Sequence, residues 1–294
     1  MEIIFLGTGS MVPTKQRNHS AILFRYKNEN ILFDCGEGTQ RQFRKAKLKP
    51  SKITKLIISH WHGDHVLGIP GLLQTLAYSD YTKTLEIYGP TGTKKYLKTM
   101  EKSSAWEIKI KIKVNEIESG KFIDNNDFMI EAFPLKHGCK CLGYRITEKD
   151  KRKVNLKYLK KHGLSKHPIL KELQQGKSIK WEGKKIDVDK ATILQKGKVI
   201  GLIMDTMKFS SLEKVGENAD LLISEATHLE KDREESYKHL TVKEAAENAK
   251  KSKAQKLILT HFSQRYKDTK DILKEAKTEF KNTKAAEDFM KIEL

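Results

Sequence analysis

The sequence predicts an α/β fold in which two mixed β-sheets pack as a sandwich, with helices on the outside. Short runs rich in Ile, Leu, Val and Phe are bounded by Gly, Pro or polar residues, which is the pattern of buried strands. Helical stretches alternate only with the later runs, so a simple alternation of strand and helix does not fit. With 294 residues and 38% apolar composition, the chain is long enough for one domain with a real core.

Eight apolar runs are the predicted strands. In chain order they are IIFLG, NILFDCG, KLIISH, LEIYG, FMIEAFPLKH, KVIGLIMD, DLLISEA and KLILTH. Thr241, followed three positions later by Glu244, forms a capping-box pattern and therefore marks a helix start. Helices are predicted over residues 69–77, 92–102, 242–251 and 268–279.

Residues 148–198 interrupt this pattern. They are rich in lysine and low in apolar periodicity, and they separate the run that ends at His137 from the run that ends at Asp205. We interpret residues 1–294 as a single domain and residues 148–198 as an inserted arm, with a short helix near residues 156–162. A disordered loop is the competing interpretation.

Positive charge is concentrated in the predicted arm. The chain has 57 Lys and Arg against 38 Asp and Glu, a net charge of +19. Residues 148–198 hold sixteen Lys and Arg against six Asp and Glu, a net charge of +10. A polyanionic partner such as nucleic acid is the natural implication, although lysine can also serve only to keep a surface soluble.

The sequence indicates a cytoplasmic protein without a membrane anchor. No apolar run approaches the ~20 residues that a transmembrane helix needs. Three cysteines, Cys35, Cys139 and Cys141, imply no disulfide framework, and we expect them to be packing thiols.

Five of the predicted strands end in a polar or ionisable side chain. Such side chains commonly form a site where the carboxyl ends of strands in an α/β sheet lie together. The five residues are His60, His137, Asp205, Glu225 and His261.

The stretch SHWHGDH, residues 59–65, is the densest group of potential metal ligands. His60 and His62 alternate along an extended segment, whereas Asp64 and His65 follow the turn at Gly63. One loop can therefore serve two metal positions. Imidazole and carboxylate ligands without cysteine suit zinc and related metals at catalytic sites.

Motifs along nearly the whole chain resemble the tRNA 3′-processing endoribonucleases of the ribonuclease Z family, within the metallo-β-lactamase superfamily. HxHxDH alone is similar only to the superfamily, whereas the later motifs are more specific. The motifs are FLGTGS, PTKQRN, FDCGEGTQRQ, SHWHGDHVLGIPGLL, LKHG, MDT, SEAT and THFSQRY. The resemblance implies the αβ/βα sandwich of that superfamily.

The resemblance also implies two zinc ions per subunit. One would be held by His60, His62 and His137. The other would be held by Asp64, His65 and His261, and Asp205 would bridge the two.

The catalytic residues implied by the resemblance are Asp64, Glu225 and His239. Asp64 would act as the general base for the attacking water. Glu225 would orient His239, which would give a proton to the leaving oxygen. His228 is a rival donor because it is closer to Glu225 in sequence. Asp34 and Glu37 are expected to support the ligand loops.

For tRNA binding, the resemblance implies two groups of residues and a homodimer. Lys15, Arg17 and Asn18 belong to the PTKQRN loop, which resembles a segment next to the tRNA 3′ end, although a solvated turn is the alternative. Lys151, Arg152 and Lys153 in the arm would contact the tRNA backbone.

The predicted activity is the removal of 3′ trailers from precursor tRNA by phosphodiester hydrolysis, which leaves a 3′-hydroxyl on the tRNA. The alternative enzyme is a metallo-hydrolase of small phosphodiesters or thioesters. A non-catalytic RNA-binding subunit is the third hypothesis, but such a protein would be expected to lose metal ligands first.

Overall fold

The computed structural model describes residues 1–103, 105, 107–233 and 237–294. The chain divides into two compact units, which we call the core unit and the insert unit. The core unit holds residues 1–123, 130–146 and 199–294, and the insert unit holds residues 124–129 and 147–198. Among the described residues, no helix combines the length and apolar character needed to cross a membrane.

The first sheet has seven strands in the order β18-β1-β2-β3-β4-β5-β6. The four strands from β18 to β3 pair antiparallel. From β3 onward, each strand pairs parallel with the next strand in the sheet order, as far as β6. The strands are β1 (Glu2–Gly7), β2 (Ala21–Tyr26), β3 (Glu29–Phe33), β4 (Lys55–Ile57), β5 (Thr84–Pro90), β6 (Lys111–Ile117) and β18 (Lys291–Glu293).

The second sheet also has seven strands, in the order β17-β16-β15-β14-β9-β8-β7. Strands β14 to β17 are parallel, so their carboxyl ends lie at one edge of the sheet. The strands are β7 (Gly120–Asp124), β8 (Phe128–Lys136), β9 (Lys140–Glu148), β14 (Val199–Ile203), β15 (Leu221–Glu225), β16 (Leu257–Thr260) and β17 (Thr283–Ala285).

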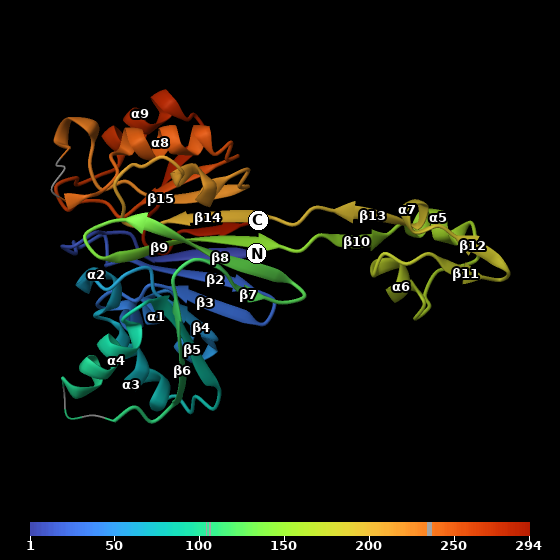
Figure 1. The fold of residues 1–294 in the computed structure, drawn as a ribbon, viewed down its shortest axis with the longest axis horizontal. Helices are drawn as coiled ribbons and strands as arrows, with labels where there is room; N and C mark the ends of the chain where they lie inside the picture. Colours follow the sequence, from blue (N-terminus) through green and yellow to red (C-terminus); the bar gives the residue numbers. More distant parts are fainter. Residues whose placement is uncertain (104, 106, 234–236) are drawn as a thin grey trace. The chain divides into compact units, whose positions relative to one another are not determined.

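Helices cover the outer faces of the two sheets, as Figure 1 shows, with α1 to α4 beside the first sheet and α8 and α9 beside the second. The predicted sandwich is therefore confirmed. Short 3₁₀ turns occupy residues 50–52, 212–216 and 230–232. The helices are α1 (Thr39–Lys45), α2 (Gly63–Val66), α3 (Ile69–Ala77), α4 (Thr93–Lys102), α8 (Val242–Lys251) and α9 (Lys270–Glu279).

Local sequence signals explain the helix starts. Thr241 accepts a hydrogen bond from the Glu244 backbone N–H, and the Glu244 carboxylate accepts one from the Thr241 N–H, so the predicted capping box is present. In α3, Pro70 stands in the first turn, where its missing N–H costs nothing. A Cβ at Gly68 would overlap the carbonyl oxygen of Gly36. Only glycine therefore allows α3 to begin so close to that loop.

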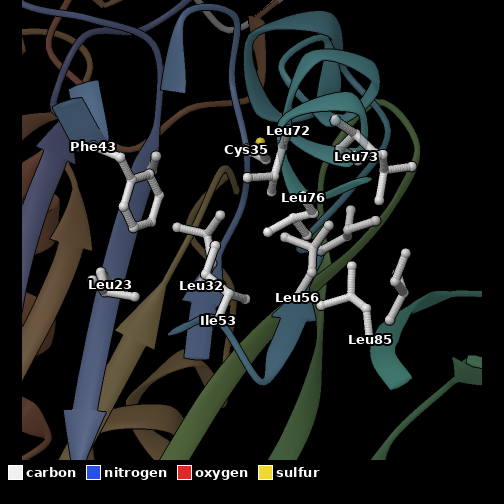
Figure 2. Packing of buried hydrophobic residues seen from close by; sticks show 14 of the residues in the cluster. Leu23, Leu32, Cys35, Phe43, Ile53, Leu56, Leu72, Leu73, Leu76 and Leu85 are labelled. Carbon is white, nitrogen blue, oxygen red and sulfur yellow. The ribbon is translucent and has the colours of Figure 1, made fainter. Parts of the chain in front are cut away.

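The two faces of the first sheet bury different side chains because successive residues of a strand point to opposite sides. Phe33 packs toward the second sheet, where its ring centroid lies 5.7 Å from that of Tyr144. Leu23 and Leu32 point the other way, into the cluster with α1 and α3 that Figure 2 shows. Cys35 is buried in the same cluster, Cys141 is also buried and Cys139 is half-buried; all three are free thiols.

The insert unit has its own secondary structure, which favours the arm over the disordered loop. Two antiparallel pairs, β10 with β13 and β11 with β12, lie among three short helices. Six buried residues form its core: Leu159, Leu164, Leu173, Ile179, Ile186 and Ala191. The elements are β10 (Lys151–Val154), α5 (Leu156–Lys160), α6 (Leu170–Gln174), β11 (Ile179–Trp181), β12 (Lys184–Ile186), α7 (Val188–Ala191) and β13 (Thr192–Gln195).

Replacing the buried Phe43 of α1 tests the packing of helices on the first sheet. Phe43 is 1% exposed, so Phe43→Ala leaves a cavity and should lower the free energy of unfolding by about 3–5 kcal/mol. Urea denaturation followed by circular dichroism measures the change. Tyr78 is 86% exposed and provides the matched aromatic control, because Tyr78→Ala should change stability by less than about 0.5 kcal/mol. Equal losses in the two variants would contradict this packing.

Candidate metal centre

Strand ends bring the histidines and aspartates of the core unit together. His60 comes shortly after β4, His137 directly after β8, and His261 directly after β16, while Asp205 lies two residues beyond the end of β14. Asp64 and His65 lie in the one-turn helix α2. The side chains that the sequence places at strand ends thus meet at one place.

Among the described residues, three groups of side chains have donor atoms that lie within 4.8 Å of one another, close enough to hold a metal ion. One of them is Glu225, His239 and His261. The other two groups contain the residues that the sequence predicts as metal ligands. Asp205 belongs to both groups. The first group is His60, His62, His137 and Asp205, and the second is Asp64, His65, Asp205 and His261.

The spacing of several donor atoms around Asp205 is the spacing expected of ligands that share a metal ion. Ligands about 2.0–2.2 Å from a tetrahedral zinc ion lie roughly 3.3–3.6 Å from one another. The Nε2 atoms of His60 and His65 lie 3.6 and 3.5 Å from Asp205 Oδ2. His261 Nε2 lies 3.3 Å from both Asp64 Oδ2 and Asp205 Oδ1. The donor atoms therefore surround points where a cation could replace these contacts.

Three buried atoms of the groups have no hydrogen-bond partner among the described residues. They are His60 Nε2, Asp64 Oδ1 and Asp205 Oδ1. Leaving such atoms unpaired in a protein interior costs free energy unless another group binds them. A metal ion would supply the missing partner, so the residues present fit the metal that the sequence implies.

Hydrogen bonds on the far side of the rings orient the histidines. His65 Nδ1 donates to Asp34 Oδ2 at 2.7 Å, which leaves Nε2 to face Asp205. Asp34 also accepts from the Ser59 N–H and hydroxyl, both at 2.7 Å. The expected support from Asp34 is therefore present. Glu37 is exposed, and the same role for it stays a prediction.

Three further contacts orient histidine rings. In the first, His60 Nδ1 lies 3.0 Å from the Ser59 hydroxyl. His137 Nδ1 lies 3.1 Å from the Lys238 carbonyl oxygen, and His261 Nδ1 lies 2.9 Å from the Thr227 hydroxyl. Thr227 is the last residue of the SEAT motif, although that motif does not by itself identify Thr227 as the partner of His261. His261 and Asp34 also adopt left-handed backbone conformations, with φ of 61° and 56°, which non-glycine residues rarely do.

Electrostatics in the site favour a neutral His60 and an ionised Asp205. Burial would lower the pKa of His65, but the charges of Asp205 and Asp64 outweigh it and hold that pKa well above its ordinary value. Burial, and then the neighbouring His65, holds the pKa of His60 well below its ordinary value. Burial alone would raise the pKa of Asp205, but the nearby His261 and His65 outweigh it and hold that pKa well below the usual range. These states of His60 and Asp205 are the ones in which imidazole and carboxylate groups bind metals.

Glu225 and His239 form a pair beside the metal-ligand groups. His239 Nδ1 donates to Glu225 Oε1 at 3.1 Å, and the backbone N–H groups of Thr206 and Leu240 donate to the same oxygen. Burial lowers the pKa of His239, but the charges of Glu225 and then Asp205 outweigh it and raise that pKa to about 9. Because Glu225 holds His239 in this way, the geometry favours His239 over His228 as a proton donor.

A pocket of about 510 Å³ opens onto these side chains. His62, Asp64, His137, Asp205 and His261 all line it. His228 and His239 line it as well, together with residues from the loop after β1. The metal-ligand groups are therefore accessible to a substrate.

The residues of the PTKQRN loop that are predicted to bind tRNA differ in their exposure and in the contacts that they already make. Lys15 is exposed, whereas Arg17 is 8% exposed, donates to the Tyr266 carbonyl oxygen at 2.7 Å and lies over the Phe262 ring. The Asn18 amide donates to the Glu37 carbonyl oxygen at 2.8 Å. Arg17 and Asn18 thus hold the shape of their loop.

In the insert unit, ion pairs engage two of the three predicted cations. Lys151 pairs with Glu148 at 2.6 Å, and Arg152 pairs with Asp189 at 2.9 Å. Lys153 is exposed. Of these three side chains, Lys153 is therefore the most available to a ligand. Contact of all three residues with tRNA stays a prediction.

Relatives match the chain over nearly its whole length. The protein named Ribonuclease Z of Listeria welshimeri is 40% identical over 306 aligned residues, which cover 100% of this chain and 99% of its own. The chain belongs to the ribonuclease Z family. The Ribonuclease Z of Bacillus cereus is 39% identical and covers 98% of this chain and 97% of its own. The resemblance carried by the motifs is confirmed.

Solved structures share the fold of this ribonuclease Z family member. Human tRNase Z, short form, is 30% identical with a TM-score of 0.74, and the match covers 100% of this chain and 99% of that one. The metallo-β-lactamase fold protein YhfI from Bacillus subtilis has a TM-score of 0.73 at 21% identity, covers 99% of this chain and 98% of its own, and shows the fold alone.

The N-terminal half of the chain also matches the model of a second protein family. Residues 1–151 match the family model of Anti-Pycsar protein Apyc1, so that half is shared with that family. The match includes SHWHGDH but ends before Asp205, His239 and His261. The ribonuclease Z relatives, in contrast, align with the whole span of the chain that carries the candidate site residues.

Removing metal should destabilise the native protein, because an ion that binds only the folded state stabilises it. Saturating zinc at about 100 times the Kd contributes about 2.7 kcal/mol, which for 294 residues corresponds to a fall in Tm of roughly 4–5 °C on chelation. Calorimetry of the protein with EDTA, and then with zinc restored, measures this shift.

Two variants control for nonspecific effects of the chelator. His62→Ala removes a partly exposed member of the first group and should reduce the zinc-dependent rise in Tm. His167→Ala removes an exposed histidine of the insert unit and should leave that rise unchanged. A Tm that does not respond to EDTA or zinc would count against a metal centre.

Proposed function

We propose that this protein is a metal-dependent endoribonuclease that removes 3′ trailers from precursor tRNA. The observation that carries the proposal is the convergence of seven histidine and aspartate side chains in a chain that matches Ribonuclease Z relatives from end to end. The reaction is hydrolysis of one phosphodiester near the discriminator nucleotide. Its products are a tRNA with a 3′-hydroxyl and a trailer with a 5′-phosphate.

The proposed cofactor is a pair of zinc ions. His60, His62 and His137 hold one ion, Asp64, His65 and His261 hold the other, and Asp205 contributes to both. A ligand set of imidazole and carboxylate supports zinc at a catalytic position, and the unpaired buried atoms support occupancy. When bound, the ions lower the pKa of a water molecule and neutralise charge on the phosphate.

The protein's own residues handle the protons in this proposal. Asp64 accepts the proton of the attacking water, and His239 gives a proton to the departing 3′ oxygen. Glu225 keeps His239 oriented, because its carboxylate accepts a hydrogen bond from the His239 Nδ1–H group. This contact leaves Nε2 to face the substrate. A raised pKa keeps His239 protonated at neutral pH, although cations near Asp205 would act in the opposite direction.

Substrate binding in the proposal depends on charge and shape. Lys151, Arg152 and Lys153 of the insert unit contact the tRNA backbone, and Lys15 contacts the 3′ region. Arg17 and Asn18 act mainly by holding the loop that carries Lys15. Phosphate contacts of this kind select a folded RNA with little regard to its base sequence and weaken with added salt.

Two further parts of the proposal concern assembly and location. The protein is a homodimer, which sedimentation equilibrium can test directly. It acts in the cytoplasm, in keeping with its three free thiols.

Cleavage of a precursor tRNA is the decisive measurement. The purified protein with zinc or manganese should cut a trailer-bearing transcript near the discriminator, and Asp64→Ala should reduce kcat/KM by at least about 100-fold because it removes both a ligand and the base. Asp271→Ala, at an exposed aspartate of α9, should leave kcat/KM unchanged. Sequencing both product ends fixes the position of the cut.

The same assay separates the leading function from its alternatives. Precursor cleavage should become slower as salt rises, whereas a hydrolase of small phosphodiesters should be indifferent to moderate salt. An intact transcript under all metal conditions would reject the endoribonuclease. Tight RNA binding with no cleavage by either the wild type or Asp64→Ala would favour a non-catalytic RNA-binding subunit.

Changing the leaving group tests the role of His239. His239→Ala should lower kcat for precursor tRNA by about 10²–10⁴-fold, because the departing 3′ oxygen then lacks a proton donor. Bis(p-nitrophenyl) phosphate releases a stable phenolate that needs no proton, so its hydrolysis should change little. Equal losses on both substrates would indicate that His239 serves the metal centre instead.

A further inference from the structure

Three large apolar side chains are exposed around the metal-ligand pocket. Met11 and Val12, in the loop after β1, are 60% and 42% exposed, and Tyr237, before α8, is 51% exposed. The described part of the chain has ten exposed large hydrophobic residues, and three of them are among the seventeen residues that line the pocket. Exposed apolar side chains are therefore concentrated at the candidate active site.

We call Met11, Val12 and Tyr237 the apolar rim. Contacts with neighbouring segments hold the backbone of the loop that carries Met11 and of the segment that carries Tyr237. The Ser10 N–H donates to the Phe262 carbonyl oxygen at 3.1 Å, and His19 Nε2 lies 3.1 Å from the Met11 carbonyl oxygen. Next to Tyr237, the Lys238 carbonyl oxygen lies 3.1 Å from His137 Nδ1. The rim is thus tied to the same segments that carry the candidate metal ligands.

Hydrolysis of a phosphodiester does not itself require apolar side chains. Imidazole, carboxylate and metal ions act on the phosphate, whereas an exposed tyrosine or methionine beside them costs hydrophobic free energy until something covers it. Single exposed apolar residues are common on protein surfaces, but three around one polar pocket call for a flat apolar ligand. The nucleobase next to a cleaved phosphate is such a ligand.

We propose that Met11, Val12 and Tyr237 form a base-stacking platform for a nucleotide that flanks the scissile phosphate. The proposal rests on the proposed function, since it assumes that the pocket cleaves a polynucleotide. Stacking on an aromatic ring tolerates every base, because each base has a π-face. The platform therefore selects an unpaired nucleotide, whose face is free, without selecting a base sequence.

A cycle that combines a protein variant with a modified substrate tests the platform. Precursor tRNA is made with normal bases, or with one abasic nucleotide immediately 5′ or 3′ of the cut. For the wild type, the abasic change on the stacked side should lower kcat/KM roughly 5- to 150-fold. Tyr237→Ala should cause a similar loss on the normal substrate but little additional loss on the abasic one.

Matched variants distinguish stacking from other effects. Tyr237→Phe keeps the ring and should retain most of the activity, and Met11→Ala should show a smaller loss that also disappears on the abasic substrate. Tyr78→Ala removes an exposed tyrosine that does not line the pocket and should respond to the abasic change like the wild type. Thermal unfolding of each variant checks that the fold is intact.

Additive losses for Tyr237→Ala and both abasic substrates would overturn the platform. Full activity of Tyr237→Ala on the normal precursor would overturn it as well. In either case the wild type still cuts the precursor, so the proposed function survives. A wild type that cuts no precursor would instead reject the proposed function, and the platform with it.

Discussion

A buried negative charge at Asp205 is the constraint on which the rest of the site depends. The residue is 1% exposed, and imidazole nitrogens of His60, His65, His137, His239 and His261 lie within 3.3–3.8 Å of its carboxylate. An ionised carboxylate in a protein interior requires compensating positive charge and hydrogen bonds. Both sheets end next to Asp205, so the sandwich brings the compensating groups to it from strands far apart in the sequence.

Local patterns allowed much of the fold to be predicted. Helix α3 was predicted over the residues it occupies, and α8 was too, because a capping box marks its start. The strands that deliver His60 and His261 are short apolar runs with clear ends. Strand β6 was missed because charged residues alternate along it, and pairing with β5 stabilises its extended backbone. Strand β2 was missed although AILF is an uninterrupted apolar run.

Long-range contacts explain what could not be predicted at the site and in the insert. Arg17 reads as a solvated cation in its loop, yet tertiary packing places it over Phe262. Thr227 lies in the SEAT motif, but only tertiary packing brings its hydroxyl to Nδ1 of His261. In the insert, the buried residues from Leu159 to Ala191 lack a helical or strand period, so their common core is visible only after folding.

The left-handed backbone at His261 and Asp34 sets the stability of the fold against the function of these two side chains. A side chain in this region costs of order 1–3 kcal/mol, which surrounding packing must offset. Glycine would relieve the strain at either position and remove the group that makes the position useful. Glycine at position 34 would also remove the hydrogen bonds of Asp34 to Ser59 and His65, and glycine at position 261 would remove a candidate metal ligand, so relief of strain would be offset by lost contacts. Engineering of a more stable form should therefore leave both residues unchanged and introduce stabilising substitutions in helices distant from the site.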